Sequence, residues 1–405
     1  MSSSTGHHRR TGRTGRTGRT GRNRRNRRTR RTRNLTIATA VAVTAGGGGS
    51  WLALAPGTAG AASRTVVVSS TAALQDAVAH AEAGTTIQVR GGTYWPTHSL
   101  KSSADGTPTA RITLAAYGGE KVRIDGSKLP AGAWLAGISG DYWTVENLTF
   151  RKSPAHGFVA TSSTGGVFKN LVTADNGNTG FTLRGEGTRH NLVQNLDSHG
   201  NFDPATHGQN ADGIAVKFGS GQGNRITGAR LSGNADDGLD LWKFAGPVTI
   251  EHTWAYGNGR NRWHDPAFEG NGNGFKLGGG GTVAAHTVTN NAAWDNALHG
   301  FTENSNPGAT ALRRNTAYAN EKAGFSFATG RARLSKNLAA ANGDRPAKVG
   351  SSAVSAGNNW DSGVATPAFR STDARTAYGP RRADGSLPVT TFLTTGNAPI
   401  GSTMN

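Results

Sequence analysis

The sequence predicts an all-β solenoid, a parallel β-helix with three short strands in each coil. Three observations lead to this fold: an asparagine that returns every 22 to 38 residues, a glycine–apolar pair that follows it, and intervening segments that alternate like strands. Repeats of this period are typical of solenoids. The repeated asparagines are Asn176, Asn201, Asn234, Asn258, Asn296, Asn320 and Asn342.

The glycine pair fixes the register of the repeat. The pairs are Gly180-Phe181, Gly213-Ile214, Gly238-Leu239, Gly274-Phe275, Gly300-Phe301 and Gly324-Phe325. In four coils the asparagine precedes the glycine by 4 residues, but after Asn201 and Asn258 the gaps are 12 and 16. Without the extra residues, the two longest asparagine spacings, 33 and 38, become 25 and 26. Two loops are therefore inserted at one corner of an otherwise regular coil.

The segments between these markers are predicted to be strands. VFKNLV, HNLVQNL, VTIEHTW and HTVTNNAAW alternate in polarity and are rich in β-branched and aromatic residues. The L-x-x-L-x-L pattern of leucine-rich repeats is missing, and a propeller blade needs roughly 40 residues. An ordinary turn preference could explain the asparagines, but their fixed offset from glycine favours a stacked ladder that bonds successive coils.

The ends of the chain differ from the repeat. Residues 71–82, TAALQDAVAHAE, have the pattern of an amphipathic helix, which we expect to cap the N-terminal end of the stack. We therefore assign residues 62–342 to the β-helix and its cap. Residues 343–405 lose the repeat and are expected to form loops that cover the C-terminal end.

The charge of the chain is concentrated at its N-terminus. The formal net charge is +19, but residues 1–61 contain 13 Arg with no Lys and no acid, which leaves +6 for the remainder. This distribution argues against nucleic-acid binding by the mature protein. The absence of Cys excludes disulfides and Cys-ligated metal sites. Nothing in the pattern favours an oligomer, so we expect a monomer.

Residues 1–61 are predicted to be an Arg-rich region and an export signal. Four TGR repeats and an Arg-rich run precede the apolar segment 35–45, and small residues end the region at Ala59-Gly60-Ala61. The apolar segment is too short to span a membrane. An arm that binds nucleic acid is the alternative, and Arg30-Arg31 resembles a twin-arginine signal only loosely. We expect a secreted, extracellular protein without membrane attachment.

Carboxylates gather at equivalent positions of neighbouring coils. Because side chains alternate across a strand, the residue after each apolar marker faces solvent, and Asp240 occupies that place in its coil. Asp212 and Asp237 both precede a marker glycine, so stacking places them together, with Asp236 and Asp240 beside them. Four such carboxylates repel one another unless a hard cation such as Ca²⁺ neutralises them. We predict a Ca²⁺ site here; the alternative is that DADG and DDG are turn sequences.

Two lysines complete the candidate site. Lys276 occupies the outward position on the coil after Asp240, and the glycines of GNGFKLGGGG leave it uncovered. A divalent ion nearby would favour the neutral amine and lower its pKa from about 10.4, which suits a general base. Lys217 lies on the Asp212 coil and is a candidate for binding a substrate carboxylate; a solvated surface lysine is the alternative.

These groups suit removal of a proton α to a carboxylate. In a uronic acid polymer, the C5 hydrogen lies beside the C6 carboxylate, and a cation bound to that carboxylate makes the hydrogen more acidic. Lys276 would accept the proton, and the glycosidic oxygen at C4 would leave to give an unsaturated sugar. The mildly basic body suits a polyanionic substrate.

The motifs NADGIAVKFG, SGNADDGLDLW, NGNGFKLGG and HGFTENSNPGATALRRNTAYAN resemble those of polysaccharide lyase family 9, the pectate lyase L type. The resemblance covers roughly residues 65–390. It implies a right-handed parallel β-helix, a catalytic Ca²⁺ and β-elimination of pectate, an acidic plant cell-wall polysaccharide. By motif match, the implied base is Lys276. The implied metal ligands are Asp212, Asp236, Asp237 and Asp240.

The resemblance leaves the substrate open. Thr302 stands where the family often has an acidic or amide residue, which puts the local substrate contacts in question. A rhamnogalacturonan lyase of the same family is one alternative. Two others are a β-helix glycoside hydrolase that uses a pair of carboxylates, and a non-catalytic, Ca²⁺-stabilised carbohydrate-binding module or adhesin.

Overall fold

The structure is a computed structural model that describes residues 63–396 and 398–405. The predicted Arg-rich region and export signal, residues 1–61, lie outside the described residues. Within the described part, no helix has the length and apolar character needed to cross a bilayer.

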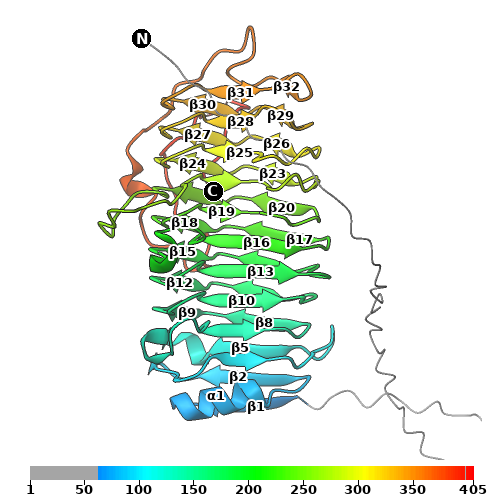
Figure 1. Cartoon of the computed structure of the whole chain (residues 1–405), viewed down its shortest axis with the longest axis vertical. Coiled ribbons are helices and arrows are strands. Elements are labelled where there is room, and N and C mark those ends of the chain that lie inside the picture. The colour runs from blue at the N-terminus through cyan, green and yellow to red at the C-terminus, as the bar shows by residue number, and fades with distance from the viewer. Residues whose placement is uncertain (1–62, 397) are drawn as a thin grey trace, which may run out of the picture. The chain divides into compact units, whose positions relative to one another are not determined.

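The described chain forms a parallel β-helix with three sheets, as predicted (Figure 1). Sheet I contains β1 (Arg64–Val68), β2 (Thr85–Val89), β5 (Ile112–Ala116), β8 (Trp143–Glu146), β11 (Val167–Lys169), β14 (Leu192–Gln194), β17 (Asn224–Thr227), β20 (Val248–Glu251), β23 (Thr287–Thr289), β26 (Ala311–Arg313), β29 (Arg333–Ser335) and β32 (Val354–Ala356). Sheet II contains β3 (Gly92–Tyr94), β6 (Val122–Asp125), β9 (Leu148–Arg151), β12 (Val172–Ala174), β15 (Asp197–His199), β18 (Arg230–Ser232), β21 (Trp254–Tyr256), β24 (Ala292–Trp294), β27 (Thr316–Tyr318) and β30 (Leu338–Ala340). Sheet III contains β4 (Leu100–Ser102), β7 (Ala136–Ile138), β10 (Phe158–Thr161), β13 (Phe181–Gly185), β16 (Ile214–Gly219), β19 (Leu239–Asp240), β22 (Phe275–Lys276), β25 (Phe301–Thr302), β28 (Phe325–Phe327) and β31 (Ala347–Val349).

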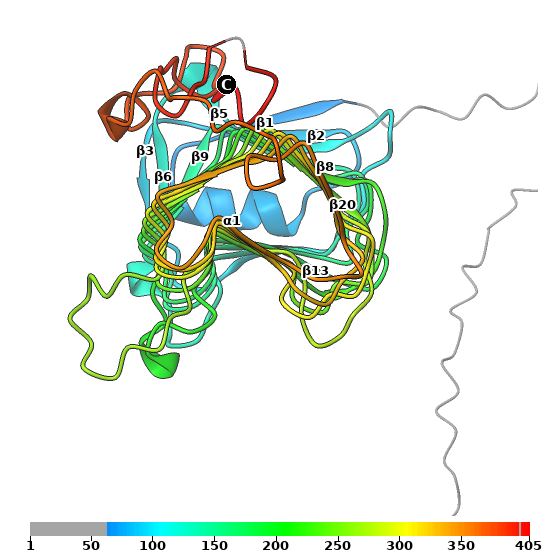
Figure 2. The same cartoon turned by 90° about the horizontal axis from the view of Figure 1, so that it is seen from above.

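Each coil passes from sheet I to sheet II to sheet III before the next begins, and each strand lies beside its counterparts in the neighbouring coils. Figure 2 shows the sheets as the sides of one outline when the molecule is viewed along the stack, with helix α1 (Thr71–Ala79) inside that outline. Short 3-10 turns interrupt the loops at η1 (Tyr117–Gly119), η2 (Gly126–Lys128), η3 (Pro204–Thr206) and η4 (Ala374–Thr376).

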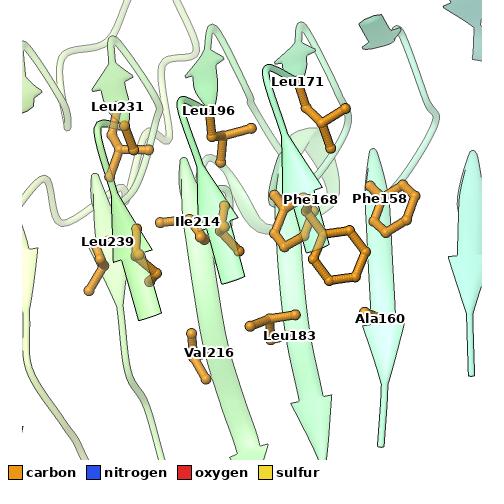
Figure 3. Close-up of a cluster of buried hydrophobic side chains, with 14 of the residues drawn as sticks. Phe158, Ala160, Phe168, Leu171, Leu183, Leu196, Ile214, Val216, Leu231 and Leu239 are labelled. Carbon is orange, nitrogen blue, oxygen red and sulfur yellow. The ribbon is translucent and has the colours of Figure 1, made fainter. Parts of the chain in front are cut away.

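The core is a column of apolar side chains that repeat from coil to coil (Figure 3). The residues after the marker glycines pair in register along sheet III and are fully buried. Among them, the Phe275 and Phe301 rings stack 4.7 Å apart, and the Phe301 and Phe325 rings stack 4.9 Å apart. The inward register predicted from glycine is therefore confirmed. Asp240 and Lys276, which directly follow two of these residues, lie on the opposite face of the strands but are buried, rather than facing solvent as predicted.

Asparagine ladders hold the corners together. In the predicted ladder, every Oδ1 after that of Asn176 accepts from the backbone N–H and the Nδ2 of the preceding coil's asparagine, as Asn296 does from Asn258 at 3.2 and 2.9 Å. A second ladder, at the corner between sheets I and II, was not predicted. It runs through Asn291, Asn315, Asn337 and Asn358.

Helix α1 (Thr71–Ala79) caps the N-terminal end, as predicted, with Leu74 and Val78 buried against the first coils. It is three residues shorter than the predicted span 71–82. Its N-cap is Ser70, whose Oγ accepts from the backbone N–H of Ala73 at 3.2 Å.

The prediction that residues 343–405 cover the C-terminal end is wrong for most of that segment. Strands β31 and β32 continue the coil, and Trp360 packs on the end, with its ring 4.9 Å from Phe325. Residues 369–396 and 398–405, here called the C-terminal strap, instead lie against the outer face of sheet II. The physical reason is that this face carries Trp254 and Trp294, whose large apolar surfaces need cover.

Candidate functional site

The two inserted loops lie side by side at one edge of sheet III. The backbone N–H of Glu269 in the second loop donates to the carbonyl of His207 in the first at 2.8 Å. The rings of Phe202 and Trp263 stack 4.7 Å apart. These contacts join the loops, 202–212 and 259–273, into one wall, as expected from their common corner.

Three aspartates form the centre of the site. Asp212, Asp237 and Asp240 are buried, and each offers a carboxylate oxygen within 4.8 Å of the other two. The coil register brings them together: the backbone N–H of Gly213 donates to the carbonyl of Asp237, and Asp240 pairs with Ala215 on the preceding coil. Stacking thus gathers carboxylates that are up to 28 residues apart in the sequence.

Two ammonium groups bind this cluster. Lys217 Nζ lies 2.8 Å from Asp212 Oδ2 and 2.7 Å from Asp240 Oδ2. Lys276 Nζ lies 3.0 Å from Asp237 Oδ2 and 3.2 Å from Asp240 Oδ2. Lys276 therefore contacts two aspartates of the cluster beside which it was predicted to lie. Lys217 is buried against the carboxylates rather than free on the surface.

Asp236 directly precedes Asp237 in the sequence, but its carboxylate accepts hydrogen bonds from the two inserted loops. Oδ2 accepts from the backbone N–H of Asn210 at 2.9 Å, and Oδ1 accepts from that of Asn271 at 2.8 Å. Each carboxylate oxygen keeps a further lone pair, so the predicted metal-ligand role of Asp236 stays a prediction. The structure adds a second task, which is to anchor both loops beside the cluster.

Sequence reasoning missed two supporting residues. Asn273 donates from its backbone N–H and its Nδ2 to Asp237 Oδ1, both at 2.8 Å. Asn273 precedes a marker glycine, as Asp212 and Asp237 do, and this position could have identified it as a site residue. The Trp242 ring lies 5.3 Å from Lys276 Nζ and fills the space left by Gly279, where a Cβ would come within 2.0 Å of the ring. This contact is one reason for the glycines after Lys276.

The electrostatics of the site favour charged lysines and raise the pKa of two of the acids. Burial, reinforced by the neighbouring aspartates, raises the pKa of Asp212 to about 6 and that of Asp236 to about 8. Burial alone would lower the pKa of Lys276, but the surrounding carboxylates, led by Asp237, outweigh it and raise that pKa. The sequence predicted a lowered pKa for Lys276. The protein's own groups raise it instead, because the amine contacts the carboxylates directly.

The cluster fits a hard cation. The three carboxylates and two ammonium groups leave one formal negative charge uncompensated. Asp212 Oδ1 is buried, with no hydrogen-bond partner in the described chain. Oxygen-only donors with excess negative charge are the ligands that Ca²⁺ and Mg²⁺ prefer. The donor set is thus suitable for such an ion, with Asp212, Asp237 and Asp240 as its holders.

Comparison with known proteins agrees with this architecture. A family model described as "Pel9A-like, right handed beta helix region" matches residues 55–342. The chain is 42% identical over 355 residues to pectate lyase PEL9 of Emericella nidulans, covering 79% of this chain and 86% of that protein.

Solved structures show the same fold. The crystal structure of pectate lyase Pel9A matches with a TM-score of 0.73 and 32% identity, over 80% of this chain and 84% of that one. A rhamnogalacturonan lyase matches with a TM-score of 0.72 at 22% identity, over 82% and 93%, which supports the fold alone. The protein therefore belongs to the Pel9A-like right-handed β-helix family of polysaccharide lyases, family 9.

Proposed function

We propose that this protein is a secreted, Ca²⁺-dependent lyase that cleaves pectate by β-elimination, with Lys276 as the general base. The observation that carries the proposal is the contact of the Lys276 amine with a buried triad of aspartates on the outer face of sheet III. The family relatives named as pectate lyases support the reaction class. Export rests on the pattern of residues 1–61.

The chemistry requires a base and a way to make the C5 hydrogen acidic. Lys276 Nζ would accept the C5 proton, the C5–H electron pair would form the C4=C5 double bond, and the C4–O bond would break onto the glycosidic oxygen, which takes up a proton. A divalent cation held by Asp212, Asp237 and Asp240 would supply positive charge for the uronate carboxylate and offset the negative field that keeps Lys276 protonated.

The remaining residues arrange these two groups. Asn273 orients Asp237 through two hydrogen bonds, and the Trp242 ring, 5.3 Å from Lys276 Nζ, restricts the lysine side chain. The joined loops make a wall beside the site, which favours a substrate lying across the strands. Lys217 neutralises Asp212 and Asp240, so its proposed role changes from free substrate contact to charge balance within the cluster.

The test is an ultraviolet assay for the unsaturated product on polygalacturonate, with Ca²⁺ and then with EDTA. We expect absorbance to rise only with Ca²⁺ and only with Lys276 intact, so that Lys276→Met is inactive. Lys322→Met, which removes an exposed lysine, is the matched control and should remain active. Full activity of Lys276→Met would refute the assignment of the base.

The same assay separates the alternatives. A rhamnogalacturonan lyase would give the ultraviolet signal on rhamnogalacturonan and not on polygalacturonate. A glycoside hydrolase would release reducing ends without new absorbance, and its activity would survive EDTA. A binding module would retain the polymer without releasing any product.

A further inference from the structure

A cavity lies on the same face of sheet III as the candidate site, nearer the N-terminal end. Its volume is about 160 Å³, and its lining includes His156, Thr182, Arg184 and Phe218. Lys217, which pairs with Asp212 and Asp240, also lines it, so the cavity adjoins the candidate site. Thr182 pairs with Ala215, Ala215 with Asp240, and Asp240 with Lys276. Thr182 and Ala215 both line the cavity. At the usual strand spacing of ~4.8 Å, its floor is thus two to three coils, or about 10 to 14 Å, from the candidate base.

Arg184 is the charged group of this cavity. Its Cζ lies 5.7 Å from the Trp134 ring centroid and 5.9 Å from that of Phe218. Within the described part of the chain it forms no ion pair and its guanidinium donates no hydrogen bond. Its register partner on the next coil, Lys217, is by contrast fully engaged with two aspartates. Arg184 therefore has its five N–H donors available for a ligand.

The backbone presents Phe218 to this cavity at a conformational cost. Arg184 pairs with Lys217, but Gly185 pairs with Gly219, so Phe218 is the extra residue of a bulge. Its φ is 53°, a value that a bulky residue rarely adopts, and its side chain is 51% exposed. Bulges commonly redirect a side chain next to a binding site. An exposed aromatic ring beside an unpaired guanidinium suits a ligand with an apolar face and a carboxylate.

Two further polar atoms in the cavity lack partners. Thr182 Oγ1 and His156 Nδ1 are buried and have no hydrogen-bond partner within the described chain. Thr182 is only 3% exposed, so water does not readily replace the missing partner. Buried polar groups usually have hydrogen-bond partners. Two such groups without partners in one cavity therefore indicate a ligand that supplies the missing hydrogen bonds. Burial, with the charges of Arg184 and Lys217, lowers the pKa of His156 to about 4 and keeps its ring neutral.

We propose that this cavity is a distal subsite for an unesterified uronate residue of the polymer, with Arg184 binding the carboxylate and Thr182 and His156 bonding sugar hydroxyls. The proposal rests on the proposed function, because it assumes an acidic polysaccharide. It adds that the polymer extends from Lys276 toward the N-terminal coils. A larger cavity of about 390 Å³, lined by Lys101 and Trp134, continues the same track.

The test compares Arg184→Ala with Arg189→Ala, an exposed arginine of the same coil outside the cavity. Binding of polygalacturonate and of digalacturonate to the full chain is measured by calorimetry, and KM and kcat by the ultraviolet assay. We expect Arg184→Ala to weaken polygalacturonate binding and raise its KM roughly ten- to hundred-fold, with kcat unchanged, because a charged hydrogen-bond pair is lost. Digalacturonate carries the same carboxylate and can occupy the subsite without reaching Lys276, so its binding should also be weaker for Arg184→Ala than for Arg189→Ala. Fully methyl-esterified polymer should not distinguish the two variants.

A second variant separates a loss of polymer binding from a loss of folding. Thr182→Val replaces an unpaired buried hydroxyl with a methyl group, so the unfolding midpoint should rise while polygalacturonate affinity falls. Equal polygalacturonate affinity for the Arg184 and Arg189 variants, with wild-type turnover intact, would refute the subsite and leave the proposed function standing. Polygalacturonate binding that depends on Arg184 without any unsaturated product would support the subsite and refute the proposed reaction. Absence of polygalacturonate binding by the wild type would refute both.

Discussion

Lys276 competes with a metal ion for the same oxygens. Its ammonium group lies 3.0 and 3.2 Å from Asp237 and Asp240, two of the three residues that would hold the cation. A positive charge so close lowers the affinity of those carboxylates for a second positive charge. The base and the metal site are therefore energetically coupled, and this coupling can be measured without turnover.

Lys276→Met is expected to raise Ca²⁺ affinity, roughly tenfold or more, because it removes this competing charge. Without Ca²⁺ the variant should unfold at lower denaturant, since a buried carboxylate loses its partner, and added Ca²⁺ should restore the midpoint. Calorimetric titration and urea unfolding provide the two readouts, with Lys322→Met as control. An unchanged Ca²⁺ affinity would show that the ion binds elsewhere.

The residues of the site were predictable to the extent that register determined them. Asp212, Asp237, Asp240 and Lys276 follow from their offset to the marker glycines, because coils stack with a fixed spacing. The hydrogen bonds of Asp236 were not predictable, since its partners come from the inserted loops, where register gives no information. The ion pairs of Lys217 and Lys276 were not predictable either, because they depend on how far each side chain extends.

At the scale of the elements, the asparagine ladders at the corners determine where the strands begin. Each interior asparagine satisfies buried backbone groups at a turn, so the ladder substitutes for the strand bonds that end there. The ladder through Asn176 was predicted because its members precede glycines. The ladder through Asn291 and Asn315 was missed although its spacings, 24, 22 and 21, repeat in the same way. Its members lack a glycine marker, and only the structure shows that they share a corner.

Asn296→Ala should destabilise the protein by about 3 kcal/mol, because it removes the acceptor of two Asn258 donors inside the stack. Asn342→Ala, at the end of the same ladder, should cost less, since the groups it leaves are only partly buried. Urea unfolding of both variants checks the difference. Equal losses at the two positions would contradict a stacking role that depends on burial.

For the whole molecule, the two long faces have different tasks. Sheet III carries the site and the proposed distal subsite, whereas sheet II is covered by the C-terminal strap. Arg381 in the strap lies 2.7 Å from Asp197, which also pairs with Arg230 on the next coil. The strap thus ties successive coils together along one side. The sequence did not reveal this, because the strap has no repeat and its apolar residues are scattered.

Phe392→Ala is expected to release the strap without unfolding the coils. The Phe392 ring is buried against Trp294 at 5.1 Å, and its loss should cost about 3–5 kcal/mol of the local packing. Because a solenoid coil contacts mainly its neighbours, the strap can detach while the site on sheet III keeps its structure. We therefore expect rapid proteolysis within residues 369–405 and red-shifted tryptophan fluorescence, with Ca²⁺ binding retained. Val389→Ala, at a site that is 75% exposed, should do neither. If Phe392→Ala abolished Ca²⁺ binding together with strap packing, the two faces would have to be one cooperative unit rather than separate ones.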